Sequence, residues 1–280
     1  MLENSFCHLD GVGSLTETRL WEQGICTWEM ALAATGDVRR YARRRLQREL
    51  PGSIHALQER DVSYFAERFA ASDMWRIWNY FRDDACFLDL ETTGLPPGPV
   101  KITVAALCDW NQVQLFIRGY NLKALPRALV NYKVVVTFNG KTFDFPVLRK
   151  EFPTWQCKAG HIDLIYPLRR IGRSGGLKHI LRQLRLTKSG TLDQVDGWLA
   201  PVLWSEYKKK GNKGALETLK AYAVNDVIHL PALADYVHNA MVRRLSFEVS
   251  KIPSVPTLAN PYKVNGKVIR QLRSQNWWFE

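Results

Sequence analysis

Two carboxylates stand two residues apart at the end of an apolar run, in the segment FLDLETTGL, residues 87–95. On an extended strand the side chains of Asp89 and Glu91 point to one face, because residues i and i+2 share a face. Ionised carboxylates at the edge of a core need a compensating partner. A divalent cation would supply it, so this pair predicts a metal site.

Two further segments place carboxylates in mainly apolar surroundings. Asp144 stands in VVVTFNGKTFDFP, and Asp226 stands in AYAVNDVIHL. Hard divalent metals prefer oxygen ligands of this kind, and two ions roughly 3.5 to 4 Å apart clamp the attacking and leaving oxygens of a phosphoryl displacement. Together with Asp89 and Glu91, these residues predict a site for two divalent ions that suits an in-line phosphoryl displacement; with the family resemblance given below, the expectation becomes two Mg²⁺ or Mn²⁺ ions and metal-dependent phosphodiester hydrolysis.

A simpler explanation exists for each segment alone. The Asp-x-Glu pair also fits a solvated strand end. Asn139-Gly140 is a strong hairpin signal, which would make Asp144 the start of a returning strand. Residues 142–146 instead favour a helix start, with Asp144 as the N-cap. Asp226 also fits the surface of an amphipathic helix, so the metal site is favoured by the three segments jointly.

The elements that position these carboxylates follow from hydrophobic periodicity and from breaker residues. Residues 1–83 are expected to be helical, with a capping box at Ser14-x-x-Glu17 and a helix stop at Gly24. From residue 85 strands and helices alternate. Strands are expected at 85–90, 101–108, 112–118, 133–138 and 161–164, and helices at 121–131, 144–151, 177–186 and 215–229. Pro231 should end or kink the last of these helices.

The expected helix at 177–186 is amphipathic. Its buried stripe consists of Leu177, Ile180, Leu181 and Leu184, and its opposite face carries Lys178, Arg182 and Arg185. The tail from Lys251 contains three prolines and is expected to be extended and weakly ordered. Trp277 and Trp278 in this tail would either stack on bases or pack against the domain, and the sequence leaves both open.

The composition of the 280-residue chain is that of a globular protein, with 46% hydrophobic residues. Its formal net charge of +12 and pI near 9.6 favour an anionic partner such as nucleic acid. The cysteines stand singly, which indicates neither a zinc site nor a disulfide framework. No segment fits a secretion signal or the roughly 18 apolar residues of a membrane span. We therefore expect a soluble cytoplasmic protein without a membrane partner.

The joint pattern of motifs resembles the DEDD exonucleases, the DnaQ-like superfamily that includes polymerase proofreading domains. Its motifs occur in order as Asp89-x-Glu91, then Asn139 with Asp144, then Tyr222-x-x-x-Asp226. The phrases FLDLETTGL, HIDLIYPLRR and GGLKHILRQL look most like the little-characterised bacterial ribonuclease H-like proteins of that superfamily. The resemblance covers about residues 84–240.

The resemblance implies an α/β ribonuclease H-like fold, with a mixed five-stranded sheet whose first three strands are antiparallel, flanked by helices. We therefore expect three parts. Residues 1–83 form a helical appendage with a helix-hairpin-helix-like segment, residues 84–245 the exonuclease domain, and residues 246–280 a Pro-containing basic tail. The four-carboxylate metal set of the superfamily falls here on Asp89, Glu91, Asp144 and Asp226.

The last motif matches the tyrosine subtype. The histidine branch places its general base five residues before the final Asp, where this chain has Ala221, whereas the tyrosine branch places Tyr four residues before, which fits Tyr222. Residues i and i+4 share a helical face, so Tyr222 and Asp226 would reach one site. A free Tyr has a pKa near 10 and is a poor base at neutral pH. Tyr222 is therefore expected to orient the attacking water, with a core aromatic as the plainer alternative.

Residues beside the motifs have expected roles of their own. The resemblance implies that the terminal nucleotide is contacted by Thr92, Thr93, Gly94 and Leu95, although Thr-Thr-Gly alone also fits a strand-ending turn. Asn139 would bond the substrate or hold the loop before Asp144. His161 and Asp163 share a strand face, and Asp163 is a secondary candidate for a carboxylate near the metals. His229 is expected to be buried or to support the site rather than to act as a base.

The N-terminal segment 8–25 resembles a helix-hairpin-helix, because the turn Gly11-x-Gly13 opens into a capped helix. Such a turn presents backbone N–H groups to phosphate. An ordinary interhelical turn explains the same glycines, and Asp10 would repel a phosphate there. Six arginines crowd the following helix, namely Arg39, Arg40, Arg43, Arg44, Arg45 and Arg48. Such clusters are usually solvated faces, although this one could also follow a nucleic-acid backbone without base specificity.

The sequence thus predicts a metal-dependent 3′–5′ exonuclease that acts on nucleic acid, with single-stranded DNA or RNA as the expected substrate and no nucleotide cofactor. The polarity comes from the resemblance alone. Two alternatives stay open: a structure-specific endonuclease on the same fold, and a non-catalytic nucleic-acid-binding protein. Oligomeric state, pathway and the choice between DNA and RNA do not follow from the sequence.

Overall fold

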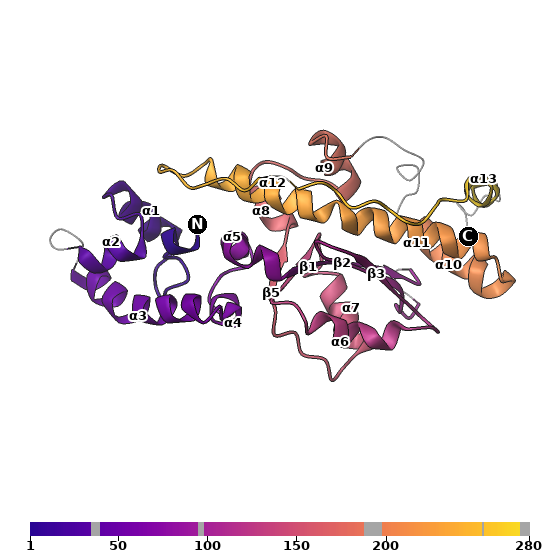
Figure 1. Ribbon diagram of the computed structural model, residues 1–280, viewed down its shortest axis with the longest axis horizontal. Helices are drawn as coiled ribbons and strands as arrows, with labels where there is room; N and C mark the ends of the chain where they lie inside the picture. Colours follow the sequence, from indigo (N-terminus) through magenta and orange to yellow (C-terminus); the bar gives the residue numbers. More distant parts are fainter. Residues whose placement is uncertain (35–39, 95–97, 188–197, 254, 275–280) are drawn as a thin grey trace.

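A five-stranded sheet lies between two layers of helices at the centre of the molecule (Figure 1). The computed structural model describes residues 1–34, 40–94, 98–187, 198–253 and 255–274, without the side chains of residues 40–43. The N-terminal helices form one end of the elongated molecule, and the C-terminal segment reaches the other. The expected Leu95, Trp277 and Trp278 contacts lie outside the described residues.

The sheet has the strand order β3-β2-β1-β4-β5. Its strands are β1 Ala85–Thr92, β2 Ile102–Cys108, β3 Val113–Ile117, β4 Val134–Thr137 and β5 Gly160–Asp163. β1 to β3 are antiparallel neighbours, whereas β4 and β5 run parallel to β1. This topology confirms the expected mixed sheet. It makes β1, which contains Asp89 and Glu91, the central strand.

The two faces of β1 pack against different helices, because alternate side chains of a strand point to opposite faces. Leu88 and Leu90 belong to the hydrophobic cluster that includes residues of α6 (Leu125–Leu129) and α7 (Asp144–Glu151). Phe87 belongs to the other cluster, together with residues of α11 (Lys213–Ile228) and α12 (Leu230–Val242). Asp89 and Glu91 alternate in phase with Phe87, so they lie on the α11 face.

Three further helices belong to the same layer as α11. They are α8 Ile165–Arg170, α9 Leu177–Gln183 and α10 Leu199–Lys210. α11 ends at Ile228 and α12 begins at Leu230 with Pro231 in its first turn, as the sequence predicted. The sequence analysis missed α10, although Pro201 near its start and Gly211 with φ +67° after its end are both helix-boundary signals.

The first part of the chain is helical, as expected. Its elements are the 3₁₀ helices η1 Leu2–Asn4, η2 Met74–Ile77 and η3 Arg82–Asp84, and the α-helices α1 Ser14–Glu22, α2 Trp28–Ala33, α3 Arg40–Gln58, α4 Val62–Ala66 and α5 Trp78–Phe81. Gly24, with φ +79°, follows the end of α1 as predicted. A further 3₁₀ turn, η4 Leu122–Ala124, precedes α6.

The expected capping box of α1 is absent, because Glu17 faces the interior. The N-cap of α1 is Gly13, with no side-chain cap hydrogen bond. The Glu17 carboxylate, 1% exposed, accepts backbone N–H groups from Phe6 and Cys7 at 2.6 and 3.1 Å. It also pairs with Arg76 of η2 at 2.8 Å. A buried carboxylate needs these partners more than an exposed N-terminus needs a cap.

The tail is more ordered than expected, because it packs along α11. Asn260 donates its side-chain N–H to the Ala221 carbonyl at 2.7 Å, and the Asn265 backbone N–H is donated to the Thr218 hydroxyl at 3.0 Å. Asn265 then caps a further helix, α13 Gly266–Ser274, by accepting the Val268 N–H. The prolines alone predicted an extended chain, and the asparagine cap overrides that expectation.

A hydrophobic core joins the N-terminal helices to the sheet. Trp78 of α5 contacts the Phe87 ring of β1 at 5.9 Å between centroids, and its indole N–H is donated to Asp235 of α12 at 3.0 Å. The same cluster includes buried residues from Met1 to Leu272. Within the described ranges of the chain, no helix is both long and apolar enough to cross a membrane.

Candidate active site

Carboxylates from β1 and α11 meet on one face of the sheet. One oxygen from each of Asp89, Glu91 and Asp226 lies within 4.8 Å of the others. Glu91 and Asp226 are each only 8% exposed, and Asp89 is half-buried. Three anions in so small a volume repel one another unless a cation or protons intervene. The geometry is therefore that of a cation-binding group.

Asp144 approaches the group of three from the start of α7 without belonging to it. It is the first helical residue, and the N-cap is Phe143, so the expected N-cap role of Asp144 is wrong. Its Oδ1 atom is buried without a hydrogen-bond partner among the described residues. Buried carboxylate oxygens are rarely left without a partner. This orphaned oxygen indicates a place for a cation or a water beside Asp144.

The loop before Asp144 is held by a carboxylate of the edge strand. Asp163 of β5 accepts the backbone N–H groups of Asn139 and Lys141 at 2.7 and 3.0 Å. Asn139 adopts φ +65°, which Asn tolerates better than most residues. A Cβ on Gly140 would lie 2.2 Å from the Thr137 hydroxyl, so this position accepts only glycine. Asp163 therefore shapes the loop rather than supplying an oxygen to the group of three.

The carboxylates are strongly perturbed electrostatically. Burial and the neighbouring carboxylates, Glu91 first, raise the pKa of Asp89 well above its ordinary range. Burial and then Asp226 raise the pKa of Glu91 in the same way. Burial raises the pKa of Asp226 as well, and it raises the pKa of Asp144 to about 7. Without a cation, the four groups could not all be ionised near neutral pH.

The Lys178 ammonium lies over the Tyr222 ring beside the carboxylates. Tyr222, on α11 one turn before Asp226, is 5% exposed, and its hydrogen bond lowers the pKa of Asp226. The Lys178 ammonium of α9 lies 4.0 Å from the centre of the Tyr222 ring. Burial raises the pKa values of Asp89, Glu91 and Asp226, and the Lys178 charge offsets part of that rise.

Lys178 is the site residue that the sequence analysis missed. It was grouped with Arg182 and Arg185 on the outer face of α9; those two are exposed, but Lys178 is half-buried. Its position one residue after Leu177 puts it at the border of the apolar stripe, where a lysine stem packs while its head reaches polar groups. This border position was the sequence signal from which a role for Lys178 near the carboxylates could have been predicted.

The two histidines near the motifs have different outcomes. His229 is 8% exposed, and its Nδ1 is hydrogen-bonded to the Asn225 carbonyl at 2.6 Å, which agrees with a buried role. His161 lies on the far face of the sheet from α11, where its ring stacks on Phe145 at 3.9 Å. Burial first, and then two nearby cations, lower its pKa to about 3, so the ring is neutral.

The residues expected against a terminal nucleotide follow β1. Thr92 is 6% exposed, and Gly94 has φ +124°. The Thr93 hydroxyl is donated to the Pro99 carbonyl at 2.8 Å and accepts the Lys101 N–H at 3.1 Å, which closes the β1–β2 connection. A hollow of about 340 Å³ is lined by Thr93 and Gly94 together with Lys101. Asn139 uses its side-chain oxygen to accept the Thr142 hydroxyl at 2.8 Å, so it supports the loop.

A profile described as the RNase_H superfamily matches residues 86–238, more than half of the chain. The chain belongs to the RNase_H superfamily. The matched segment contains every carboxylate of the site. Membership of the RNase_H superfamily supports a nuclease in general. Comparison with curated proteins gives no match.

Several solved structures are similar to this RNase_H superfamily member. A family B DNA polymerase from Pyrobaculum calidifontis is 14% identical, with a TM-score of 0.44, over 55% of this chain and 25% of the polymerase. Brucella melitensis NrnC with bound Mg²⁺ is 20% identical, with a TM-score of 0.41, over 59% of this chain and 77% of that one. The Nibbler EXO domain of Aedes aegypti is 14% identical, with a TM-score of 0.42, over 64% of this chain and 85% of that one. The chain thus spans a quarter of the polymerase.

The glycine turn outside the matched RNase_H segment already has internal partners. The Asp10 N–H is donated to Glu49 at 2.8 Å, and Arg45 donates to the Asp10 carbonyl at 2.5 Å. Glu49 therefore occupies the side from which a phosphate would approach the Asp10 N–H. Of the six arginines, Arg39 and the side chains of Arg40 and Arg43 lie outside the description. Arg48 pairs with Glu49 at 2.6 Å.

Proposed function

We propose that this chain is a metal-dependent 3′–5′ exonuclease of the DEDD type, tyrosine subtype, that hydrolyses phosphodiester bonds of single-stranded DNA or RNA. The observation that carries the proposal is the convergence of Asp89, Glu91 and Asp226 within 4.8 Å on a half-buried face. A structural role would favour neutral side chains there, because buried like charges destabilise a fold. The 3′–5′ polarity rests on the resemblance of the sequence motifs.

The donor set fits two Mg²⁺ or Mn²⁺ ions. These ions take oxygen ligands, keep several waters, and bind through a few carboxylates plus substrate phosphates. Asp89, Glu91, Asp144 and Asp226 supply only carboxylate oxygens, and one Asp144 oxygen has no hydrogen-bond partner among the described residues. When bound, the ions would lower the pKa of a water and neutralise the charge of the phosphate undergoing displacement.

The side chains of the protein would orient the reacting groups. Tyr222 would hold the attacking water through its hydroxyl, since the hydrogen bond to Asp226 fixes the ring beside the carboxylates. Lys178 would attract the scissile phosphate and limit the mutual repulsion of the carboxylates. Thr92, Thr93 and Gly94 line the end of β1, where the terminal nucleotide would lie, and the loop containing Asn139 would keep Asp144 in place.

The experiment uses a 20-nucleotide single strand of DNA or RNA with a 5′ label, incubated with purified protein in Mg²⁺, Mn²⁺ or EDTA. We expect stepwise shortening that EDTA stops. Asp89→Asn should lower the rate by at least about a hundredfold, since it removes a ligand whose effect appears in the transition state. Asp83→Asn, at an exposed acidic residue just before β1, is the matched control.

A covalently closed circle distinguishes the exonuclease from an endonuclease. We expect the circle to survive while the linear strand is degraded. Cleavage of the circle at a similar rate contradicts the exonuclease, and degradation in EDTA or by Asp89→Asn contradicts the metal mechanism. A protein that binds both strands without cutting either contradicts the enzyme as a whole.

A further inference from the structure

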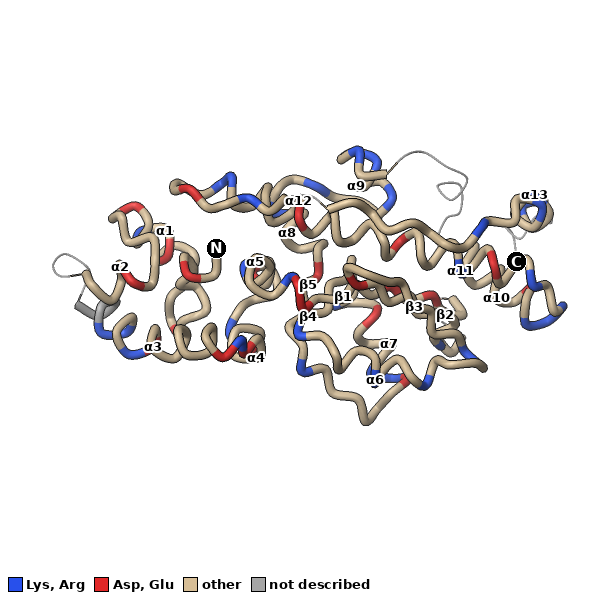
Figure 2. Tube along the Cα trace, viewed as in Figure 1, with Lys and Arg blue, Asp and Glu red and all other residues tan. Residues whose placement is uncertain are grey.

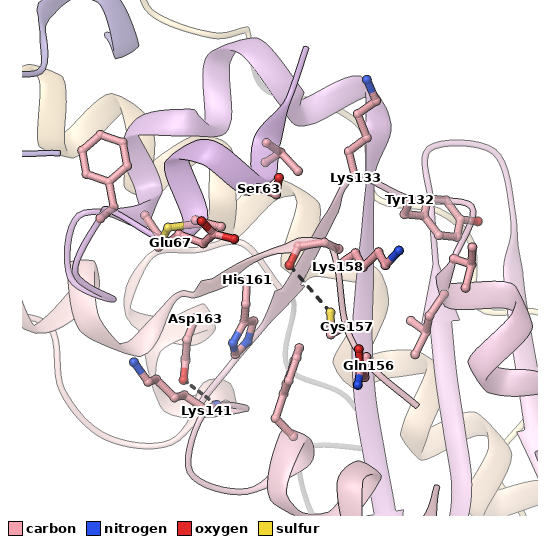
Figure 3. Close-up of a pocket in the computed structure, with 18 of the residues that line it drawn as sticks. Ser63, Glu67, Tyr132, Lys133, Lys141, Gln156, Cys157, Lys158, His161 and Asp163 are labelled. Carbon is pink, nitrogen blue, oxygen red and sulfur yellow. Dashed lines mark hydrogen bonds between the residues drawn. The ribbon is translucent and has the colours of Figure 1, made fainter. Parts of the chain in front are cut away.

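A large cavity lies where the N-terminal helices meet the edge of the sheet (Figure 3). It encloses about 1130 Å³. One wall is α4 with the turn before it, and the other is β5 with the outer side of α7. Asp89, Glu91 and Asp226 do not line it. The cavity is thus separate from the carboxylate group, on the opposite face of the sheet.

The lining of the cavity is rich in cations. They are Arg60, Lys133, Lys141, Arg149 and Lys158. Arg60 forms an ion pair with Asp84 at 2.6 Å. Within the described residues, no carboxylate oxygen lies within 4.0 Å of a side-chain nitrogen of the other four cations. Lys133 donates to the Arg60 carbonyl at 3.0 Å, which satisfies a hydrogen bond but leaves its charge uncompensated. Four positive charges therefore face a shared space with no ion-pair partner of their own.

The acidic residues of the lining neutralise only part of this charge. Asp61 accepts the backbone N–H groups of Ser63 and Tyr64 at the start of α4. Asp163 accepts two backbone N–H groups from the loop that precedes α7 and one from Ile165 at the start of α8. Glu67 is exposed at the rim. The lining holds five cations and three carboxylates, so its charge balance is positive and favours an anionic occupant.

Aromatic side chains accompany the cations. Tyr132 and Trp155 are half-buried on the wall of the cavity. Trp155 lies 6.0 Å from the Phe145 ring, and Phe145 stacks on His161, so the aromatic surface is continuous and rigid. Cationic grooves with aromatic faces are how proteins bind single strands, through phosphate contacts and base stacking. A volume above the roughly 300 to 1,000 Å³ of small-molecule sites also favours a segment of polymer.

We propose that this cavity binds single-stranded nucleic acid beyond the end that is cut. The strand would pass the loop that follows β4, at the end of β5 near Asp163, because α4 and η2 pack against the other end of β5 at Gly160. Lys141 joins the two regions, because it lines the cavity and belongs to the loop that leads to Asp144. The identity of the strand rests on the proposed function, whereas the anion-binding character rests on the cavity alone.

The test measures binding in Asp89→Asn protein, which keeps the strand intact. Added Arg149→Gln and Lys158→Gln remove two cations from the cavity. The matched control adds Lys123→Gln and Lys150→Gln, which are equally exposed but lie outside the cavity. The affinity for a fluorescein-labelled 20-nucleotide oligothymidylate is followed by anisotropy over a salt series. We expect the cavity variant to bind about tenfold more weakly and to lose roughly 1.4 from its salt slope, since each phosphate contact on a single strand contributes about 0.7.

The free thiol of Cys157 can show whether the oligonucleotide binds in the cavity. Cys157 lines the cavity, and Cys26 does not. Bound oligonucleotide should slow alkylation of Cys157 by N-ethylmaleimide while Cys26 reacts at an unchanged rate. Equal weakening in both charge variants, unprotected Cys157, or protection by millimolar adenosine monophosphate but not by the oligonucleotide would each overturn the proposal.

A small substrate separates this inference from the proposed function. In otherwise wild-type protein, Arg149→Gln with Lys158→Gln should leave hydrolysis of the p-nitrophenyl ester of thymidine 5′-phosphate unchanged, because that molecule is too short to reach the cavity. The same variant should raise KM for the 20-nucleotide strand about tenfold. Loss of hydrolysis of the small ester would contradict the cavity as a separate binding region. Absence of hydrolysis in the wild type counts against the enzyme, and the binding measurements still decide the cavity.

Discussion

The Lys178 ammonium lies 4.0 Å from the centre of the Tyr222 ring, which places a positive charge on the aromatic face one helical turn from Asp226. Cation–π contacts of this kind contribute roughly 0.5 to 2 kcal/mol. The contact fixes both partners, because Tyr222 comes from α11 and Lys178 from α9. A lysine in this position can act on a phosphate without being a metal ligand.

Replacement of Lys178 by methionine should lower kcat for the labelled strand by about ten- to a hundredfold, because a charge near the transferred phosphate is removed while the packed stem is kept. Lys178→Arg should recover part of the rate. Arg182→Met, on the exposed face of the same helix, serves as the control and should keep the wild-type kcat. A Lys178→Met protein with unchanged kcat would show that the lysine only compensates the carboxylates.

Metal-free protein should become less stable as pH rises from about 6.5 towards 8, where the buried histidines no longer contribute to the pH dependence. The pKa of Asp144 is raised to about 7, and the pKa values of its carboxylate neighbours are raised too. The folded state therefore binds protons more tightly than the unfolded state, and this stability is lost as pH rises through the folded values. Thermal unfolding in EDTA checks the trend, and millimolar Mg²⁺ should reverse it by mass action.

Asp89→Asn should raise Tm in EDTA at pH 8, because one of the repelling charges is removed. A gain of 1 kcal/mol corresponds to about 2 to 4 °C in a chain of this size. The same variant should lose most of the Tm increase caused by Mg²⁺. A lower Tm in EDTA, with Asp83→Asn unchanged, would mean that Asp89 is paired in the metal-free protein.

Buried histidines should make the protein sensitive to mild acid. Burial is the first cause that lowers the pKa values of His8, His161 and His238 to about 3, from an ordinary value of 6.5. Below pH 6.5 the histidines of the unfolded chain bind protons that these buried rings do not. The histidines therefore lower stability as pH falls, by about 1.4 kcal/mol per pH unit for each ring, against the opposite contribution of the carboxylates. Urea unfolding at pH 7.5 and 5.0 measures this loss.

His238→Leu should make that pH dependence shallower by about one proton. Both ring nitrogens of His238 lack a side-chain hydrogen-bond partner among the described residues, and the ring packs on Trp75 at 6.0 Å. The exposed His55 provides the control substitution, His55→Leu, which should leave the slope as it is. An unchanged slope in His238→Leu would show that this ring does not resist protonation.

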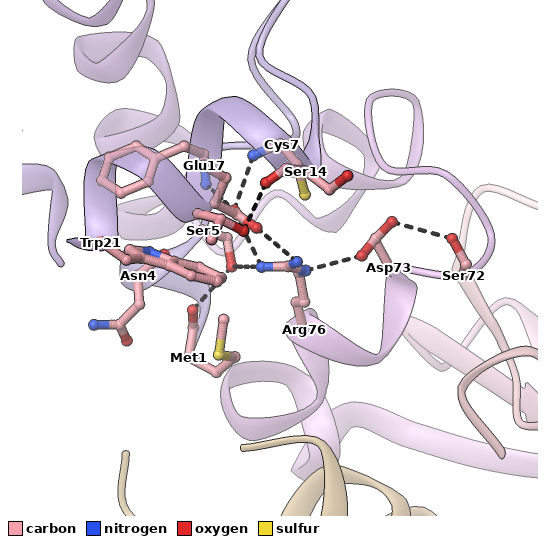
Figure 4. A network of polar contacts seen from close by, with 12 residues as sticks. Met1, Asn4, Ser5, Cys7, Ser14, Glu17, Trp21, Ser72, Asp73 and Arg76 are labelled. Atoms are coloured by element: carbon pink, nitrogen blue, oxygen red, sulfur yellow. Dashed lines mark hydrogen bonds and ion pairs between the residues drawn. The ribbon is translucent and has the colours of Figure 1, made fainter. Parts of the chain in front are cut away.

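Breaking the ion pair between Glu17 and Arg76 should cost about 3 kcal/mol, because it leaves a buried charge without its partner. The two side chains are only 1% and 5% exposed, and Arg76 also donates to Asp73 at 3.2 Å (Figure 4). The urea midpoint of Glu17→Gln should therefore fall clearly. Glu22→Gln, an exposed glutamate on the same helix, should not shift it. A double replacement, Glu17→Leu with Arg76→Met, should recover much of the loss, and its failure to do so would assign the cost to packing.

The fold followed from the sequence where one signal dominated. Apolar runs bounded by breaker residues predicted every strand. The Asp89 and Glu91 spacing predicted a shared face, because a period of two is fixed by strand geometry. The roles predicted for Glu17 and Lys178 were both wrong for the same reason. A local sequence pattern does not show which partner a charged residue contacts after folding. Glu17 matched a capping box but met Arg76, 59 residues away. Lys178 matched an outer face but met Tyr222.

The basic residues show a similar limit. Net charge predicted an anionic partner, but it did not say where the charges gather. Figure 2 shows lysines and arginines along the whole molecule, at the α3 end as well as near α10 and α13. The clustered arginines of the α3 segment drew attention by their density, whereas the cavity cations come from separate segments that only folding brings together.

The hydrophobic contact between Trp78 and Phe87 has an evolutionary consequence. A segment that is exchanged between genes needs a boundary that few contacts cross. Here the boundary near residue 84 is crossed by a tryptophan that packs on β1 and bonds to Asp235 of α12. The N-terminal helices and the RNase_H segment should therefore be inherited as a pair. Substitutions at Trp78 should be matched by changes at Phe87 or Asp235 in diverged copies of this chain.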